Sequence, residues 1–261
     1  MKLSKLLLET LVKETAHLEQ FQRQLDEAKE TIGAPKITIA IITGSDVDRR
    51  VCGCSGIRKS SALDSKADFE IVNESSDPIF YLSHKDGEKP SDFLQYGGVT
   101  KYSDHPEVKS FVESVRRYLH ESGFANSERA VHPSGFKFMR EIKDERLMEM
   151  ALFGSEFNLN ESGPNNVDAV IQGGITLERL GGPFYAMRSS KTMLKESLRH
   201  ATITDIIEQK MGAEYRPVLL TRYDSGRSNF DIESCRVGVF PKEGKIYTHT
   251  VGHNGQVYKL K

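Results

Sequence analysis

The sequence predicts a mixed α/β fold of the α+β type, with a long N-terminal helix and a β-rich C-terminal part. Three observations predict it. Apolar side chains recur at helical spacing through the first 33 residues. Short β-branched stretches bounded by glycine and proline, followed by amphipathic helical stretches, fill the middle of the chain. The last sixty residues contain strand-like runs around polar loops.

The composition limits the functional classes. The chain has 261 residues, 38% hydrophobic and 28% charged, which is typical of a soluble globular protein with one large domain or two small ones. Because 36 basic and 37 acidic residues leave a net charge of −1, any surface for nucleic acid has to be local.

The cysteines and apolar runs indicate the compartment. Cys52, Cys54 and Cys235 are too few, and odd in number, for a disulfide framework, so a reducing compartment is expected. Cys52 and Cys54 could supply two zinc ligands, but further ligands are missing nearby, which favours ordinary thiols. No run is apolar enough for a signal peptide or a transmembrane helix, so we expect a cytoplasmic protein.

The N-terminal segment predicts one amphipathic helix that ends at Gly33 and Pro35. Its stripe consists of Leu3, Leu7, Thr10, Leu11, Leu18, Phe21 and Leu25. The helix could pack on the protein core, or on a second copy of itself in a homodimer. It could also direct one acid towards a metal site, and nothing in the sequence selects among Glu9, Glu14, Glu19 and Glu27.

Two segments follow with opposite patterns. Lys36–Gly44 is β-branched and predicts a buried strand. Ser45–Ser65 is polar and rich in glycine, so we expect a loop or an irregular hairpin. Its basic residues are Arg49, Arg50, Arg58 and Lys59. They suit either a phosphate backbone or a solvated loop.

The stretch Lys66–Lys85 predicts a hairpin around a turn at Asn73–Pro78. In an antiparallel pair, Asp68 would lie beside Ser83 and Lys85 on one sheet face. An acid that holds a metal would then meet a lysine that polarises water or phosphate. The alternative is a surface Asp–Lys pair of little energetic weight. His84 points to the other face, where a packed histidine is expected.

The next stretch, Lys89–Lys101, predicts a short helix that ends at Gly97 and Gly98 and carries Gln95 and Tyr96. With Asp68 and Lys85, these residues resemble the motif of the PD-(D/E)xK nuclease superfamily, the fold of many restriction enzymes and phage exonucleases. The resemblance covers about residues 36 to 118. It implies a restriction-endonuclease-like core, which is a central mixed β-sheet flanked by helices.

The chain departs from this motif at Ser83, where the family has an acid. A serine is a poor ligand for a hard divalent cation. Glu70 could replace the missing acid, a helix glutamate or Asp86 could do so, or the site could bind without cutting.

The resemblance implies a magnesium- or manganese-dependent DNA endonuclease, restriction-like or encoded by a phage in a bacterial host. The catalytic residues would be Asp68, Ser83, Lys85 and Gln95, and the metal ligands Asp68 and Glu70. Contacts to double-stranded DNA are expected from Arg58, Lys59, Tyr96, Arg222, Arg227 and Arg236. The alternative is a non-catalytic structural or nucleic-acid-binding protein, viral in origin, that keeps a relict nuclease fold.

The remaining elements complete the prediction. Helices are expected at His105–Ser122, Lys143–Gly154 and Met193–Lys210, the last with a doubtful continuity at Ala201–Thr204. Strands are expected at Val167–Gln172, Phe184–Arg188, Arg216–Tyr223 and Ser234–Pro241, and a hairpin at Lys245–Lys261 with its turn at Asn254 and Gly255. A loop at Asn158–Asp168 marks a boundary. The predicted domains are 1–35, the N-terminal helix; 36–157, the nuclease-like core; and 158–261, a β-rich region that could continue the core.

Overall fold

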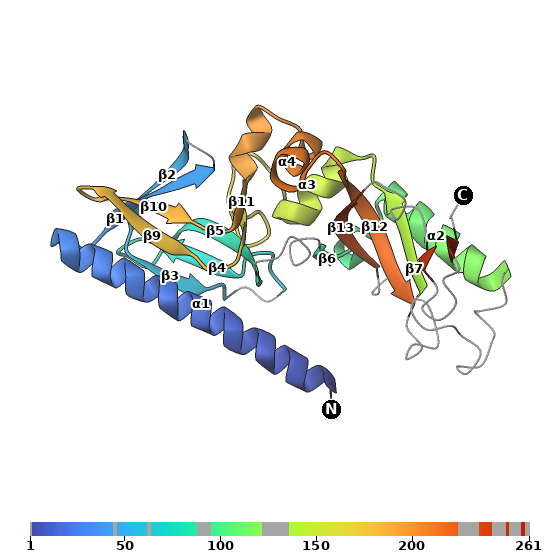
Figure 1. The fold of residues 1–261 in the computed structure, drawn as a ribbon, viewed down its shortest axis with the longest axis horizontal. Helices are drawn as coiled ribbons and strands as arrows, with labels where there is room; N and C mark the ends of the chain where they lie inside the picture. Colours follow the sequence, from blue (N-terminus) through green and yellow to red (C-terminus); the bar gives the residue numbers. More distant parts are fainter. Residues whose placement is uncertain are drawn as a thin grey trace. The chain divides into compact units, whose positions relative to one another are not determined.

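The computed structural model describes residues 2–43, 46–61, 64–87, 95–121, 136–223, 235–241, 249–250 and 257–258. Within these residues the chain is a mixed α/β protein with helices α1 to α4 and three larger sheets, mixed or antiparallel and none of them closed. The chain forms two compact units, drawn in Figure 1. Unit 1 contains residues 1–93 and 156–200, and unit 2 contains residues 94–155 and 201–261. The α/β prediction is confirmed at this level.

Helix α1, Lys2–Ile32, belongs to unit 1, and the prediction of one long N-terminal helix is confirmed. It ends at Gly33, whose φ of +63° suits a residue without a side chain. Phe21, Leu25 and Ala28 are buried in the core of the unit. In Figure 1, α1 runs along the unit beside strands β3 (Gly56–Lys59) and β9 (Thr176–Gly181).

The first sheet of unit 1 has the order β2-β1-β10-β9. Its strands are β1 (Ile37–Thr43), β2 (Asp46–Cys54), β9 (Thr176–Gly181) and β10 (Phe184–Arg188). β1 pairs in parallel with β10 and antiparallel with β2. The strands predicted at 36–44 and 184–188 are confirmed.

The prediction of a loop at Ser45–Ser65 is wrong over most of its length, because the strands β2 and β3 lie in this segment. The alternative prediction of an irregular hairpin is closer to the structure. β2 pairs with β1 across two irregularities in register. The strand β3, Gly56–Lys59, pairs with β4, Phe69–Val72. Polar residues dominate these strands because each lies at one end of a sheet, where a strand has solvent within reach.

The second sheet of unit 1 has the order β11-β8-β5-β4-β3. Its other strands are β4 (Phe69–Val72), β5 (Pro78–Lys85), β8 (Ala169–Gln172) and β11 (Lys191–Leu194). β5 and β8 are parallel, and the remaining pairs are antiparallel. One face is apolar and joins the core through Phe69, Ile71, Phe80, Leu82, Ala169, Ile171 and Leu194. The predicted hairpin and the predicted strand at 167–172 are confirmed.

The prediction of a single helix over Met193–Lys210 is wrong, because several elements share this segment. The chain continues from β11 into a 3-10 helix, Lys195–Arg199, which belongs to unit 1. α4, Ile203–Met211, then begins in unit 2 with a capping box between Thr202 and Asp205. That capping box fixes a new helix start at the point where the pattern is weak.

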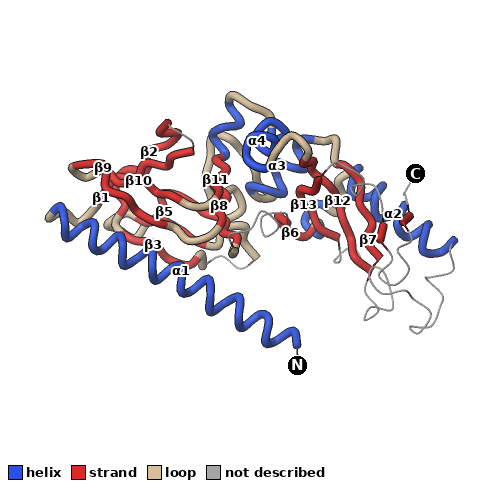
Figure 2. The backbone as a smooth tube through the Cα atoms, viewed as in Figure 1, coloured by secondary structure: helices blue, strands red, loops and turns tan. Residues whose placement is uncertain are grey.

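Unit 2 contains an antiparallel sheet of order β6-β13-β12-β7. Its strands are β6 (Gln95–Gly98), β7 (Phe136–Glu141), β12 (Tyr215–Tyr223) and β13 (Cys235–Pro241). Figure 2 shows β13, β12 and β7 side by side. α2 (Pro106–Glu121) lies next to β7, where Arg140 donates to Ser110 and Ser114. The helices predicted at 105–122 and 143–154 are confirmed, the latter as α3 (Glu145–Phe153).

The helix predicted at Lys89–Lys101 is wrong where the structure describes it. Gln95–Gly98 form β6, paired with β13, and a short 3-10 helix follows at Thr100–Tyr102. Gly97 has a φ of +151°, which a helix does not use. Pairing with a strand some 140 residues away therefore outweighs the local signal.

The remaining described elements are short. β14 (His249–Thr250) pairs antiparallel with β15 (Val257–Tyr258), which confirms a C-terminal hairpin, and its predicted turn lies outside the described residues. None of the described helices combines the length and the apolar character needed to cross a membrane.

The two units do not coincide with the predicted boundaries at residues 35 and 157. α1 is part of unit 1 because its buried side chains complete the core of that unit. Residues 156–200 return to unit 1 because β8 and β10 pair with β5 and β1.

Candidate functional site

The second sheet of unit 1 has a polar face opposite its apolar one. Residues paired directly across neighbouring strands share a face. On this basis the register aligns Glu70 with both Arg58 and Tyr81, and Lys85 with Gln172. The polar face carries Arg58, Asp68, Glu70, Tyr81, Ser83, Lys85 and Gln172.

Asp68 directly precedes β4, and hydrogen bonds hold it against β5. Its backbone N–H donates to the carbonyl oxygen of Leu82 at 2.8 Å. Its carboxylate oxygen Oδ2 accepts the backbone N–H of His84 at 2.6 Å and the hydroxyl of Ser83 at 3.2 Å. The second oxygen, Oδ1, accepts no hydrogen bond from the described residues. Asp68 therefore offers one oriented carboxylate oxygen.

Lys85 lies diagonally across from Asp68. Ser83 is beside Asp68, and Lys85 is two residues further along β5 on the same face. Diagonal positions in an antiparallel pair are about 7–8 Å apart, within reach of a lysine side chain. Among the described residues no ion pair of 4 Å or less joins Lys85 to a carboxylate. Lys85 is half-buried and next to Gln172 of β8.

Glu70 is engaged within the fold. Its side chain is 3% exposed; Oε2 accepts from Nε of Arg58 at 2.8 Å, and Oε1 accepts from the hydroxyl of Ser60 at 2.9 Å. Arg58 also donates to the carbonyl oxygen of Ser76. Both carboxylate oxygens of Glu70, which was predicted to be a metal ligand, therefore accept hydrogen bonds within the fold. Arg58, which was predicted to contact DNA, forms an ion pair with Glu70.

The other acid considered as a replacement, Asp86, lies beside α1. Its Oδ1 is 3.4 Å from Nε2 of His17. Glu19 and Glu27 of α1 are exposed. Across the part of the chain that the structure describes, no group of three histidine, cysteine or acidic side chains is placed to hold a metal ion.

His84 is a packed histidine, as predicted. It is 6% exposed, its Nε2 lies 2.9 Å from the carbonyl oxygen of Gly173, and its ring contacts the rings of His17 and Phe69. Burial lowers the pKa of His84. Its backbone N–H, which binds Asp68, links this packing to the site.

Gln95 and Tyr96 lie on β6 of unit 2, whereas Asp68 and Lys85 lie in unit 1. Tyr96 is 2% exposed, and burial raises the pKa of its phenol. The side chain of Gln95 is outside the described residues. The structure thus places the four residues of the motif in two units, because the expected helix is a strand.

The remaining predicted DNA contacts are scattered. Lys59 is exposed at the end of β3. Arg236 of β13 donates from Nη1 to the carbonyl oxygen of Cys235 at 2.8 Å. Arg222 of β12 is aligned with Lys137 in the backbone register between β12 and β7. The side chain of Arg222 and the whole of Arg227 are outside the described residues.

One residue of the polar face was missed by the sequence analysis. Gln172 is fully buried and aligned with Lys85 through the parallel pairing of β5 and β8. That pairing joins segments 87 residues apart, such as Lys85 and Gln172. The sequence predicts a strand at residues 167–172, but a strand pattern does not identify the neighbouring strand in the sheet.

Comparison of the chain with protein-family models, curated proteins and solved structures gave no match in any of the three. A function assigned to the chain therefore rests on its own residues, and above all on the polar face that Asp68, Ser83 and Lys85 share.

Proposed function

We propose that the chain is a metal-dependent nuclease that hydrolyses DNA phosphodiester bonds on the polar face of unit 1. The observation that carries the proposal is the Asp68 carboxylate, held through Oδ2 and diagonal to Lys85 on paired strands. The antiparallel order β3-β4-β5 with the parallel strand β8 supports the finer proposal of a restriction-endonuclease-like core.

The residues fit a magnesium ion held together with substrate. Mg²⁺ in phosphoryl-transfer sites uses one or two carboxylates and completes its octahedron with water and phosphate oxygens. Asp68 would hold the ion through Oδ1, while Glu70 is engaged by Arg58 and Ser60. Such an ion, when bound, polarises the phosphate and lowers the pKa of its attached water.

The protein groups then have separate roles. Ser83 and the His84 N–H orient the carboxylate of Asp68. The ammonium of Lys85 stabilises the negative charge that develops on the phosphate during attack by water. Lys59 is aligned with Phe69 on the apolar face of this sheet, so no contact to the substrate is assigned to it.

The test is nicking of a supercoiled plasmid with Mg²⁺ or Mn²⁺. Lys85→Met keeps the length of the side chain and removes its charge, so cutting should fall about 100- to 1000-fold while Mn²⁺ binding persists. Asp68→Asn should lose both cutting and Mn²⁺ binding. Lys36→Met, at an exposed pair with Glu74, is the matched control and should cut normally.

Asp68→Asn affects stability as well as the site, because the carboxylate of Asp68 accepts hydrogen bonds within the fold. Asparagine keeps an acceptor for the His84 N–H, so the loss of stability should stay at about 1–2 kcal/mol, measured by urea unfolding. A full loss of activity in a variant that is still folded then reports on the site.

A second candidate is a DNA-binding protein without hydrolysis. It is favoured by Ser83 at the position of the second acid and by the engagement of Glu70 with Arg58. Wild-type protein that cuts with neither ion, yet binds DNA in a salt-dependent manner, would replace the nuclease proposal with this one.

A further inference from the structure

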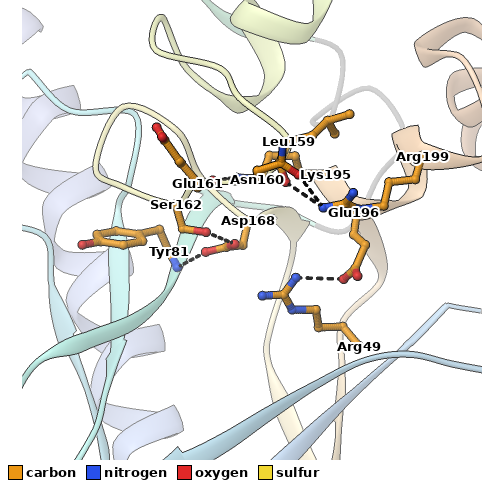
Figure 3. A network of polar contacts seen from close by, with 10 residues as sticks. All are labelled: Arg49, Tyr81, Leu159, Asn160, Glu161, Ser162, Asp168, Lys195, Glu196 and Arg199. Carbon is orange, nitrogen blue, oxygen red and sulfur yellow. Dashed lines mark hydrogen bonds and ion pairs between the residues drawn. The ribbon is translucent and has the colours of Figure 1, made fainter.

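Unit 1 contains a second polar site, at the end of the sheet where β8 begins. Here β2, the loop before β8 and the 3-10 helix Lys195–Arg199 line a cavity of about 90 Å³. This is room for roughly three water molecules, or for one tetrahedral oxyanion. Five charged side chains line it: Arg49, Asp168, Lys195, Glu196 and Arg199 (Figure 3).

The inner wall consists of Asp168 and Lys195, which are 4% and 3% exposed. Oδ2 of Asp168 accepts the backbone N–H of Tyr81 at 2.9 Å, and Oδ1 accepts the hydroxyl of Ser162 at 2.5 Å. Both oxygens are thus occupied by donors. Burial raises the pKa of Asp168, and the hydrogen bonds from Ser162 and Tyr81 oppose this.

Lys195 and Arg199 donate their hydrogen bonds to neutral acceptors. Nζ of Lys195 donates to the carbonyl oxygen of Glu161 and to Oδ1 of Asn166. Nη2 of Arg199 donates to the carbonyl oxygen of Leu159 and to Oδ1 of Asn160. These four acceptors are neutral, so none of these hydrogen bonds is an ion pair. Burial lowers the pKa of Lys195, and the nearby carboxylate of Asp168 opposes this.

Arg49 is the cation at the rim that has a carboxylate partner. Its Nη1 lies 2.8 Å from Oε2 of Glu196, and its guanidinium lies 5.9 Å from the ring centre of Phe80. Both members of the ion pair are about 40% exposed. A guanidinium has five N–H donors, so Arg49 can bind a second anion beside Glu196.

We propose that this cavity binds a phosphate-type oxyanion, either free or as the terminal phosphate of a small ester. Three cations face two carboxylates, one of which is shielded by Tyr81 and Ser162. Planar guanidinium groups match two phosphate oxygens at once. The small volume admits only the phosphate group, which leaves the rest of an ester in solvent.

The test is isothermal titration of the full chain with inorganic phosphate and, separately, with adenosine 5′-monophosphate. Ionic strength is held constant with chloride because exposed pairs are screened by salt. Saturable binding of phosphate alone indicates a site for the free ion, and binding of both indicates that a terminal phosphate suffices. Either result supports the proposal.

Three variants locate the site. Arg199→Gln and Arg49→Gln should each weaken binding about tenfold or more, as expected for a lost charge-assisted hydrogen bond. Glu196→Gln should strengthen it, because it releases Arg49 and removes a like charge. Arg50→Gln, on the same strand but over the ring of Phe184, is the control and should leave the affinity within twofold.

The outcomes that overturn the proposal are equally defined. One is the absence of saturable binding at about 10 mM phosphate, above the millimolar range of weak specific sites. Another is an equal loss in Arg50→Gln and Arg49→Gln, which would indicate attraction to the general surface. Weaker binding in Glu196→Gln would contradict the expected competition and would overturn it as well.

Discussion

At the scale of residues, Asp68 belongs to the fold as well as to the candidate site. The sequence suggested an exposed Asp–Lys pair that contributes little to stability. Instead, the hydroxyl of Ser83, which is 1% exposed, and the backbone N–H of His84 both depend on the carboxylate. A buried donor that loses its acceptor costs about 1–3 kcal/mol, so alanine at position 68 would test folding and function at once.

His84 supplies a prediction for the pH dependence of stability. Burial lowers the pKa of its imidazole and the nearby His17 adds to this, while the bond to Gly173 and the charges of Asp68 and Asp86 oppose it. Because the folded-state pKa lies below the usual 6.5, the unfolded chain takes up this proton first as the pH falls. Through His84, the free energy of unfolding should therefore decrease as the pH falls below about 6.5.

Urea unfolding between pH 8 and pH 5 checks this. His84 can contribute at most about 1.4 kcal/mol per pH unit to the slope of the unfolding free energy. His84→Gln retains a donor for the carbonyl of Gly173 and should show a shallower slope. Equal slopes for the variant and the wild type would rule out His84 as the titrating group.

At the scale of elements, α1 covers the edges of two sheets. Oε1 of Gln22 accepts the backbone N–H of Ile57 in β3 at 2.8 Å. Gln24 donates to the carbonyl oxygen of Ile175 and accepts the N–H of Leu177 in β9. These are the end strands of the two sheets of unit 1, so the helix satisfies backbone groups that would otherwise be open to a foreign strand.

The apolar stripe of α1 provides the energy for this arrangement. Phe21→Ala should lower the free energy of unfolding by about 3–5 kcal/mol, because a fully buried ring is replaced by a cavity. Glu27→Ala, on the exposed side of the same helix, should change it by less than about 0.5 kcal/mol. Chemical denaturation of both variants measures the difference. Similar small effects would mean that α1 is not part of the folded core.

At the scale of the whole molecule, the chain leaves unit 1 after residue 93 and returns to it at residue 156. The returning segment supplies central strands as well as edges. β8 lies between β5 and β11, and β10 lies between β1 and β9. Both sheets of unit 1 therefore depend on residues of the predicted region 158–261, for which continuity with the core was one of the alternatives.

A fragment of residues 1–157 tests this dependence. It ends at the predicted domain boundary and lacks β8 to β11, so the apolar faces of β1 and β5 lose their partners. We expect no cooperative thermal unfolding of the fragment by circular dichroism, in contrast to the full chain. A sharp transition in the fragment would show that residues 158–200 are dispensable for the core.

Elements with a local signal could be predicted from the amino-acid sequence. Helical spacing identified α1 because its buried residues lie within a few turns of one another. The alternation around Asn73–Pro78 placed Asp68 beside Ser83, because a short hairpin sets the register of its own strands.

Features that depend on a residue far away in the sequence could not be predicted in this way. Gln95–Gly98 form a strand because they pair with β13. Gln172 lies beside Lys85 because β8 pairs in parallel with β5. The carboxylate of Glu70 is engaged because Arg58 of β3 donates to it. The cavity around Asp168 and Lys195 likewise combines segments more than a hundred residues apart in the chain. The physical reason is that burial and ion pairing act between neighbours in space, and only the complete fold determines which residues those are.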